Sequence, residues 1–137
     1  MKIRACEKKD LKQCEDLCNI PELLYPNGGH FSVSHLIKLL DDKYFLVAEE
    51  KDKIIGLIFG EKLKAGGSMV WVIVVGKEFR GKKVGEKLLK EFEKNAKKDG
   101  CHWTVLYAAT KNKKTLEFYK KHKYDIGQKC IECAKDW

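Results

Sequence analysis

The sequence has no apolar run approaching the roughly 20 residues that a helix needs to cross a bilayer. Its first seven residues, MKIRACE, also lack the apolar stretch of a secretory signal peptide. With 2 prolines and 11 glycines the chain is neither fibrous nor linker-rich, and no repeat or low-complexity tract is visible. We therefore expect a cytoplasmic protein that folds as one domain over residues 1–137 and does not contact a membrane.

The basic residues are unevenly placed. The net charge is +8, yet residues 77–98 hold nine Lys or Arg against four Glu, and residues 111–123 hold six Lys against one Glu. Each segment thus carries +5, and the rest of the chain carries −2. This concentration indicates a local anion site, whereas a surface that coats nucleic acid more often spreads its charge. The alternative is that these lysines form solvated helix faces.

The chain has six cysteines, which lie at positions 6, 14, 18, 101, 130 and 133. In the cytoplasm we expect all of them to be thiols. Cys130 and Cys133 form a CxxC pair, but no glycine turn lies between them and no second pair completes four zinc ligands. The sequence therefore predicts no metal site.

Hydrophobic periodicity predicts alternating elements. Strands are expected at residues 2–5, 44–49, 53–63, 69–75, 103–108 and 126–133, and helices after Asp10, after Ser32 or Ser34, from about 84 to 99 and from 112 to 122. The strand at 69–75 is apolar throughout, which is typical of a central strand covered on both faces. The fold class is therefore α/β, of the mixed α+β type. We expect about six strands, with an antiparallel hairpin over residues 44–63 and a parallel βαβ unit over residues 69–108.

The segment that joins strand 69–75 to the next helix has the features of a phosphate site. Arg80, Gly81, Lys82, Lys83, Val84 and Gly85 bring basic side chains and glycines to a helix N-terminus. Unpaired N–H groups at such a terminus, together with the helix dipole, favour an anion. The alternative is an ordinary turn with exposed lysines, because neither common phosphate-loop motif is present.

A second pattern lies on the helix at 112–122. Asn112 and Tyr119 are seven residues apart, so they lie about 20° from the same direction and roughly 10 Å apart along the axis. Thr115 shares that side of the helix. One face can therefore present an amide and a phenol to the same ligand, unless Tyr119 is simply a core aromatic.

Together, the two patterns resemble the signatures of the GCN5-related N-acetyltransferase (GNAT) superfamily. Its acyl-CoA pyrophosphate loop reads Q/R-x-x-G-x-G/A; Arg80 fills the first position, Gly85 the last, and Lys83 stands at the middle glycine. Its second signature is an Asn followed seven residues later by a Tyr, as in Asn112 and Tyr119. Since Lys83 is not glycine, its backbone must adopt a conformation that such a residue can accept.

The resemblance implies a GNAT-like fold, with a central mixed, largely antiparallel sheet of about six strands and helices on both faces. It also implies transfer of an acetyl group from acetyl-CoA to a primary amine, by direct attack in a ternary complex. It implies that the co-substrate contacts Ile73 and Val75 on the strand, residues 80–85 in the loop, and Asn112, Thr115 and Tyr119 on the helix. Tyr119 would protonate the departing thiolate. Strand 69–75 lacks the carboxylate that some members place there, so the candidate bases are Glu61 and His30, which otherwise are a solvated strand end and a polar loop residue.

The acceptor amine is not specified by the sequence. The resemblance places it near residues 19–40 and 61–68, where Tyr25, His30, Phe31 and Trp71 are candidate lining residues. Only 13 residues follow Tyr124, enough for one further strand, so a homodimer that covers the sheet edge is a possible assembly. The alternative function is a non-catalytic basic domain that binds nucleic acid or CoA.

Overall fold

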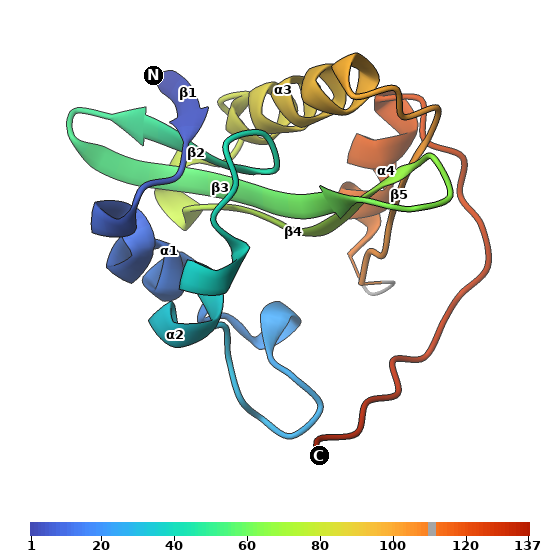
Figure 1. Cartoon of the computed structure of the whole chain (residues 1–137), viewed down its shortest axis with the longest axis horizontal. Helices are drawn as coiled ribbons and strands as arrows, with labels where there is room; N and C mark the ends of the chain where they lie inside the picture. Colours follow the sequence, from blue (N-terminus) through green and yellow to red (C-terminus); the bar gives the residue numbers. More distant parts are fainter. Residues whose placement is uncertain (110–111) are drawn as a thin grey trace.

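The computed structural model describes residues 1–109 and 112–137. A five-stranded sheet crosses the molecule in the order β1-β2-β3-β4-β5 (Figure 1). The strands are β1 (Lys2–Ala5), β2 (Phe45–Glu50), β3 (Lys53–Lys62), β4 (Ser68–Val75) and β5 (Thr104–Leu106). The first four pair antiparallel, and β5 pairs parallel with β4 through a crossover helix. The predicted mixed sheet and βαβ unit are confirmed.

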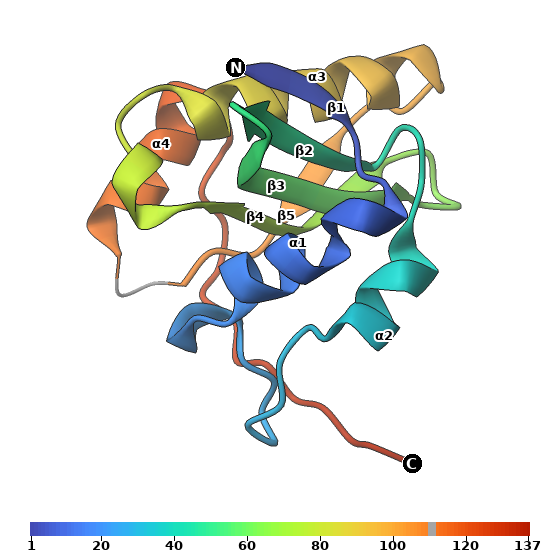
Figure 2. The same ribbon diagram turned by 90° about the vertical axis from the view of Figure 1, so that its left-hand side faces the viewer.

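Helices pack on both faces of the sheet. They are α1 (Leu11–Cys18), α2 (Val33–Leu36), α3 (Val84–Lys98) and α4 (Lys113–Lys121), with short 3-10 turns at Lys8–Asp10, Pro21–Leu23, Ile37–Leu39 and Lys77–Phe79. Figure 2 shows α1 and α2 below the sheet and α3 above it. In the described residues no helix combines the length and the apolar character needed to span a membrane.

Two apolar cores hold these layers together. On the upper face, Leu88, Leu89 and Phe92 of α3 are fully buried and pack against β2, β3 and β4 together with Tyr119 of α4. On the lower face, the fully buried Cys14 of α1 and Leu36 of α2 pack against the sheet. Truncating a fully buried aromatic side chain such as Phe92 to Ala typically costs about 3 to 5 kcal/mol.

β4 differs from its prediction in one respect. Phe59 of β3 pairs with Val72 and Gly60 pairs with Val70, so Trp71 is an extra residue that forms a β-bulge. A side chain at Gly60 would overlap the Met69 carbonyl and touch Phe92, which is why glycine stands there. The bulge exposes one part of the strand, with Trp71 at 52%. β4 is the fourth of the five strands, and its two faces are not evenly covered.

The predicted sixth strand at 126–133 is wrong, because the sheet has five strands. After α4 the chain runs as an extended segment in which Ile131 is 90% exposed (Figure 1). Gly127 disfavours a strand, and the three-residue β5 offers only a short edge to pair with. The tail instead reaches the loop before α2, where Asn27 Nδ2 donates to Asp136 Oδ2 at 2.6 Å.

Candidate active site

The two parallel strands stay together for only part of their length. The last paired position is Val70 with Leu106, and β4 continues to Val75. Within the described residues, the backbone of residues 71–75 therefore has no strand partner on the β5 side. We call this stretch the free edge of β4. Ile73 and Val75, both expected to contact the co-substrate, belong to it, and its N–H and C=O groups suit an extended ligand arm.

The loop at residues 80–85 follows the 3-10 turn Lys77–Phe79, which comes after β4. Gly81 has φ of 79° and Lys83 has φ of 64° and ψ of 18°, so two left-handed residues turn the chain into α3. For a lysine this conformation costs about 1 kcal/mol. Lys83 is the N-cap of α3, and its side chain makes no capping hydrogen bond. The N–H groups of the first turn are thus available for an anion.

Side chains around the loop extend this picture. The Lys82 ammonium lies 5.7 Å from the centre of the Phe79 ring, and Lys82 and Lys83 are exposed. Val84 is 3% exposed, so its side chain belongs to the core and only its backbone can face a ligand. A Cβ atom at Gly85 would lie 3.7 Å from both Phe118 and Val75. Gly85 therefore sits where β4, α3 and α4 meet.

Asn112 has a structural role at the start of α4. Its Oδ1 accepts hydrogen bonds from the backbone N–H groups of Lys114 at 3.1 Å and Thr115 at 3.4 Å. This is a helix N-cap, a contact worth about 1 kcal/mol. The carboxamide oxygen is thus used by the helix, and the role expected for this amide beside a ligand falls to its NH₂ group.

Tyr119 is both a core residue and a polar group. It is 6% exposed, packs in the same core as α3, and lies with its ring centre 5.7 Å from that of Tyr124. Burial raises the pKa of Tyr119 to about 12, because a phenolate would lose its hydration there. The phenol therefore keeps its proton throughout the neutral range.

The two candidate bases lie in different settings. Glu61, near the end of β3, accepts a hydrogen bond from Trp71 Nε1 at 2.7 Å. His30 lies in the loop before α2, with its Nε2 3.5 Å from Glu15 Oε2 of α1. The contacts of His30 thus attach it to α1, while Glu61 is held on the sheet beside the bulge of β4.

Among the described residues, sequence reasoning missed Trp103, which immediately precedes β5. Its side chain is 44% exposed and covers Gly67, where a Cβ atom would overlap the indole ring. The signal available in the sequence was the glycine pair before β4, together with an aromatic residue just before the neighbouring strand β5. The other expected acceptor residues are nearer α1 and α2: Tyr25 and Phe31 contact each other at 4.9 Å between ring centres.

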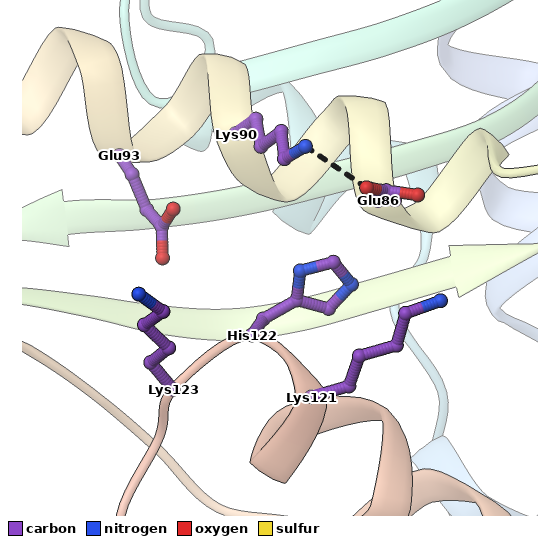
Figure 3. Close-up of a pocket in the computed structure, with 6 residues that line it drawn as sticks. All are labelled: Glu86, Lys90, Glu93, Lys121, His122 and Lys123. Atoms are coloured by element: carbon purple, nitrogen blue, oxygen red, sulfur yellow. Dashed lines mark hydrogen bonds and ion pairs between the residues drawn. The ribbon is translucent and has the colours of Figure 1, made fainter.

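A pocket of about 330 Å³ lies between α3 and the end of α4 (Figure 3). Its lining residues are Glu86, Lys90, Glu93, Lys121, His122 and Lys123. The His122 ring points toward α3 and also packs on Phe118, with ring centres 4.6 Å apart. Acidic and basic side chains from α3 and from the end of α4 line this pocket, and no residue of the free edge of β4 contributes to it. We therefore do not assign acetyl transfer to this pocket.

Residues 14–124 match the model of the acetyltransferase (GNAT) family. No curated protein matches the sequence.

Solved structures share the fold. Ard1 from Thermoplasma volcanium is 21% identical, with a TM-score of 0.82 over 93% of this chain and 84% of that one. A transcriptional regulator from Bacillus halodurans is 20% identical, with a TM-score of 0.79 over 98% and 99% of the two chains. The PaiA N-acetyltransferase from Thermoplasma acidophilum, in complex with coenzyme A, is 23% identical, with a TM-score of 0.75 over 88% and 87%. Because the family match spans most of the chain and includes the loop and the helix described above, the chain belongs to the acetyltransferase (GNAT) family of acyl-CoA-dependent transferases.

Proposed function

We propose that the protein transfers an acetyl group from acetyl-CoA to a primary amine by direct attack within a ternary complex. The observation that carries this proposal is the free edge of β4, which residues 76–83 connect to the uncapped N-terminus of α3. An extended arm can pair with the former while a pyrophosphate binds the latter. Two further findings support the use of acetyl-CoA: the chain belongs to the acetyltransferase family, and the similar PaiA structure was solved in complex with coenzyme A.

The loop residues hold the charged part of acetyl-CoA. Backbone N–H groups of residues 81–85 approach the pyrophosphate, and the guanidinium of Arg80 with the ammonium groups of Lys82 and Lys83 adds full positive charge. The side-chain position of Gly85 faces Val75 and Phe118, at the end of the free edge of β4. Asn112 and Thr115, at the start of α4, would border the arm.

Tyr119 stabilises the sulfur of CoA as it leaves. An ordinary thiol has a pKa of about 8.5, so the Tyr119 phenol, with its pKa raised by burial to about 12, is a weaker acid than the thiol that forms. The phenol therefore donates a hydrogen bond to the developing thiolate and stabilises it, and the released thiolate then takes its proton from the solvent. The protonated phenol is ready at every working pH.

The acceptor must lose a proton before it attacks. An alkylammonium ion has a pKa of about 10.4, so a base or a chain of water molecules has to take the proton. Glu61 is the base we propose, because its carboxylate is fixed by Trp71 beside the bulge of β4. His30 is the second candidate; its partner Glu15 would hold the imidazole ring in place.

The proposal is tested by calorimetry and by product mass. Acetyl-CoA should bind the purified protein, and a panel of amines should include at least one that gains an acetyl mass. Product mass is preferable to a thiol reagent, because Cys130 and Cys133 are exposed and would react with the reagent. A protein that binds a DNA duplex with steep salt dependence and ignores acetyl-CoA would instead be the non-catalytic basic domain.

A further inference from the structure

We propose that the acceptor is a monoamine with an apolar, preferably aromatic, body. Its ammonium group binds Glu61 and its body lies on the exposed sheet face formed by Met69, Trp71, Trp103 and Val105, which we call the aromatic platform. This inference rests on the proposed function and names the class of its acceptor.

The alternation of β3 assigns Glu61 to a face of the sheet. The side-chain position of Gly60 is directed at Phe92 of α3, so its neighbours Phe59 and Glu61 point to the opposite face. Phe59 accordingly belongs to the core under α1 and α2. Since the Trp71 indole donates to Glu61, Trp71 lies on this same lower face.

The platform continues from β4 to β5. Met69 pairs with Glu61 on one side and with Val105 on the other, so these three side chains share the lower face. The Trp103 ring covers Gly67, two residues before Met69, and lies on that face as well. Trp71 is 52% exposed and Trp103 is 44% exposed.

No helix covers this end of the lower face in the described residues. The core under α1 and α2 takes Phe59, Val72 and Val74 from the sheet, which lie toward the other end of β3 and β4. Figure 1 shows both helices below the other end of the sheet, away from β5. Large aromatic side chains left exposed in a row mark a binding surface.

The charges on the platform select the ligand. On the lower face of β3, β4 and β5, Glu61 is the single ionisable side chain among the residues in these strands that point there. A polyamine or an aminoglycoside carries several cations and would need several carboxylates. One carboxylate beside indole rings instead suits one ammonium ion on an apolar body, with cation–π attraction to Trp71.

Trp71 is a positioning residue in this arrangement. Its indole N–H occupies Glu61 Oε2, which leaves Oε1 to accept from the ammonium ion. Because Trp71 is the extra residue of the bulge, it lies where the platform meets the free edge of β4. The amine would therefore be held next to the place proposed for the thioester.

The first measurement compares kcat/KM for phenethylamine, hexylamine, spermidine and kanamycin, with product measured by mass. We expect phenethylamine to exceed spermidine and kanamycin by at least about tenfold, as burial of one aromatic ring on the platform allows. Efficient use of spermidine or kanamycin in preference to both monoamines would overturn the proposal.

Three variants separate the roles. Trp103→Ala should raise KM for phenethylamine about tenfold without changing kcat, because it removes surface that binds the body alone. Trp71→Phe keeps a ring and removes the N–H donor, so it should lower kcat by about tenfold, as Glu61→Gln should to a greater extent. Trp137→Phe, at the fully exposed last residue, is the matched control and should change neither constant. Equal kinetics in Trp103→Ala and the parent protein would refute the platform.

Direct binding keeps this inference distinct from the proposed function. Phenethylamine should quench the fluorescence of Trp71 and Trp103 in the Trp137→Phe protein, whether or not acetyl transfer occurs. Quenching without acetyl-CoA binding supports the platform while the proposed function fails. Acetyl-CoA binding without phenethylamine quenching leaves the function standing and overturns the platform.

Discussion

The Nε–H group of Arg80 donates a hydrogen bond to the carbonyl oxygen of Val75 at 3.2 Å. The first residue of the loop is therefore tied to the last residue of β4, and the two halves of the proposed acetyl-CoA site are joined before any ligand arrives. A site organised in this way loses less conformational entropy when the ligand binds.

Gly85 tests the position of the pyrophosphate. Gly85→Glu should abolish most acetyl-CoA binding in calorimetry, because a carboxylate would enter the space proposed for an anion. Gly85→Ala is the matched control: its Cβ would meet Phe118 and Val75 at an ordinary 3.7 Å, so the affinity should change little. Both variants should keep the circular dichroism of the parent protein. Undiminished affinity in a folded Gly85→Glu protein would place the pyrophosphate elsewhere.

The regular elements could be predicted because their patterns are local. The 3.6-residue period that places Val84, Leu88 and Phe92 on one face gave α3, and the apolar run before Gly76 gave β4. The bulge at Trp71 could not be found in this way, since it depends on the absence of a side chain at Gly60 on the neighbouring strand. Pairing across strands is not visible in a single local pattern.

The candidate site shows the same division. The spacing of Arg80 and Gly85 identified the loop, but the left-handed backbone of Lys83 follows from the turn into α3 rather than from the residue type. The sixth strand was wrong because β-forming residues at 126–133 need a partner edge to pair with, and the three-residue β5 offers little. Trp103 was missed because its exposure depends on Gly67 and on the extent of α1 and α2.

Tyr119→Phe tests the role of the phenol. The change removes one hydroxyl and keeps the ring in the core, so acetyl-CoA affinity should stay close to that of the parent protein. The single-turnover rate of acetyl transfer should fall about 10- to 100-fold, the loss expected for one hydrogen bond to a developing anion. Since the pKa of Tyr119 is raised to about 12, no loss of rate from its ionisation should occur below about pH 11. A parent-like rate would make Tyr119 a packing residue.

Lys83→Gly tests the strain at the loop. Glycine adopts a φ of 64° without the steric cost that a lysine bears, so the variant should be more stable by about 0.5 to 1 kcal/mol. Lys83→Ala removes the same charge but keeps the steric cost, and it should show no such gain. Thermal unfolding of the three proteins measures the difference. Equal stabilisation in both variants would show that charge, not backbone strain, is responsible.

The cysteines should separate into two classes. Cys130 and Cys133 are exposed in the tail, while Cys6, Cys14, Cys18 and Cys101 are buried. Burial raises the pKa of Cys18 to about 12 and so disfavours its reactive thiolate. Alkylation of the native protein should add two groups quickly and four more only after unfolding, as read from intact mass. In Cys130→Ser/Cys133→Ser the fast class should vanish; a fast class that survives would show that the tail is not the exposed segment.

The carboxylate of Asp10 should make stability depend on pH. Asp10 is 3% exposed and accepts hydrogen bonds from Arg4 at 2.7 and 3.0 Å and from the Glu7 N–H at 2.8 Å. Burial alone would raise the pKa of Asp10, but these bonds favour the charged form and hold the pKa below its ordinary value. A carboxylate whose pKa is lower in the folded state stabilises the fold above its unfolded pKa of about 3.9, and this stability is lost as the pH falls through the folded value.

Asp10→Asn should therefore cost about 2 to 3 kcal/mol of unfolding free energy at pH 7, because it leaves Glu49 as the remaining carboxylate partner of Arg4. The difference in stability from the parent protein should shrink below about pH 4. Asp16→Asn, at an exposed position on α1, should leave the unfolding curve unchanged at both pH values. A difference for Asp10→Asn that stays constant from pH 7 to pH 2 would mean that the carboxylate contributes packing rather than charge.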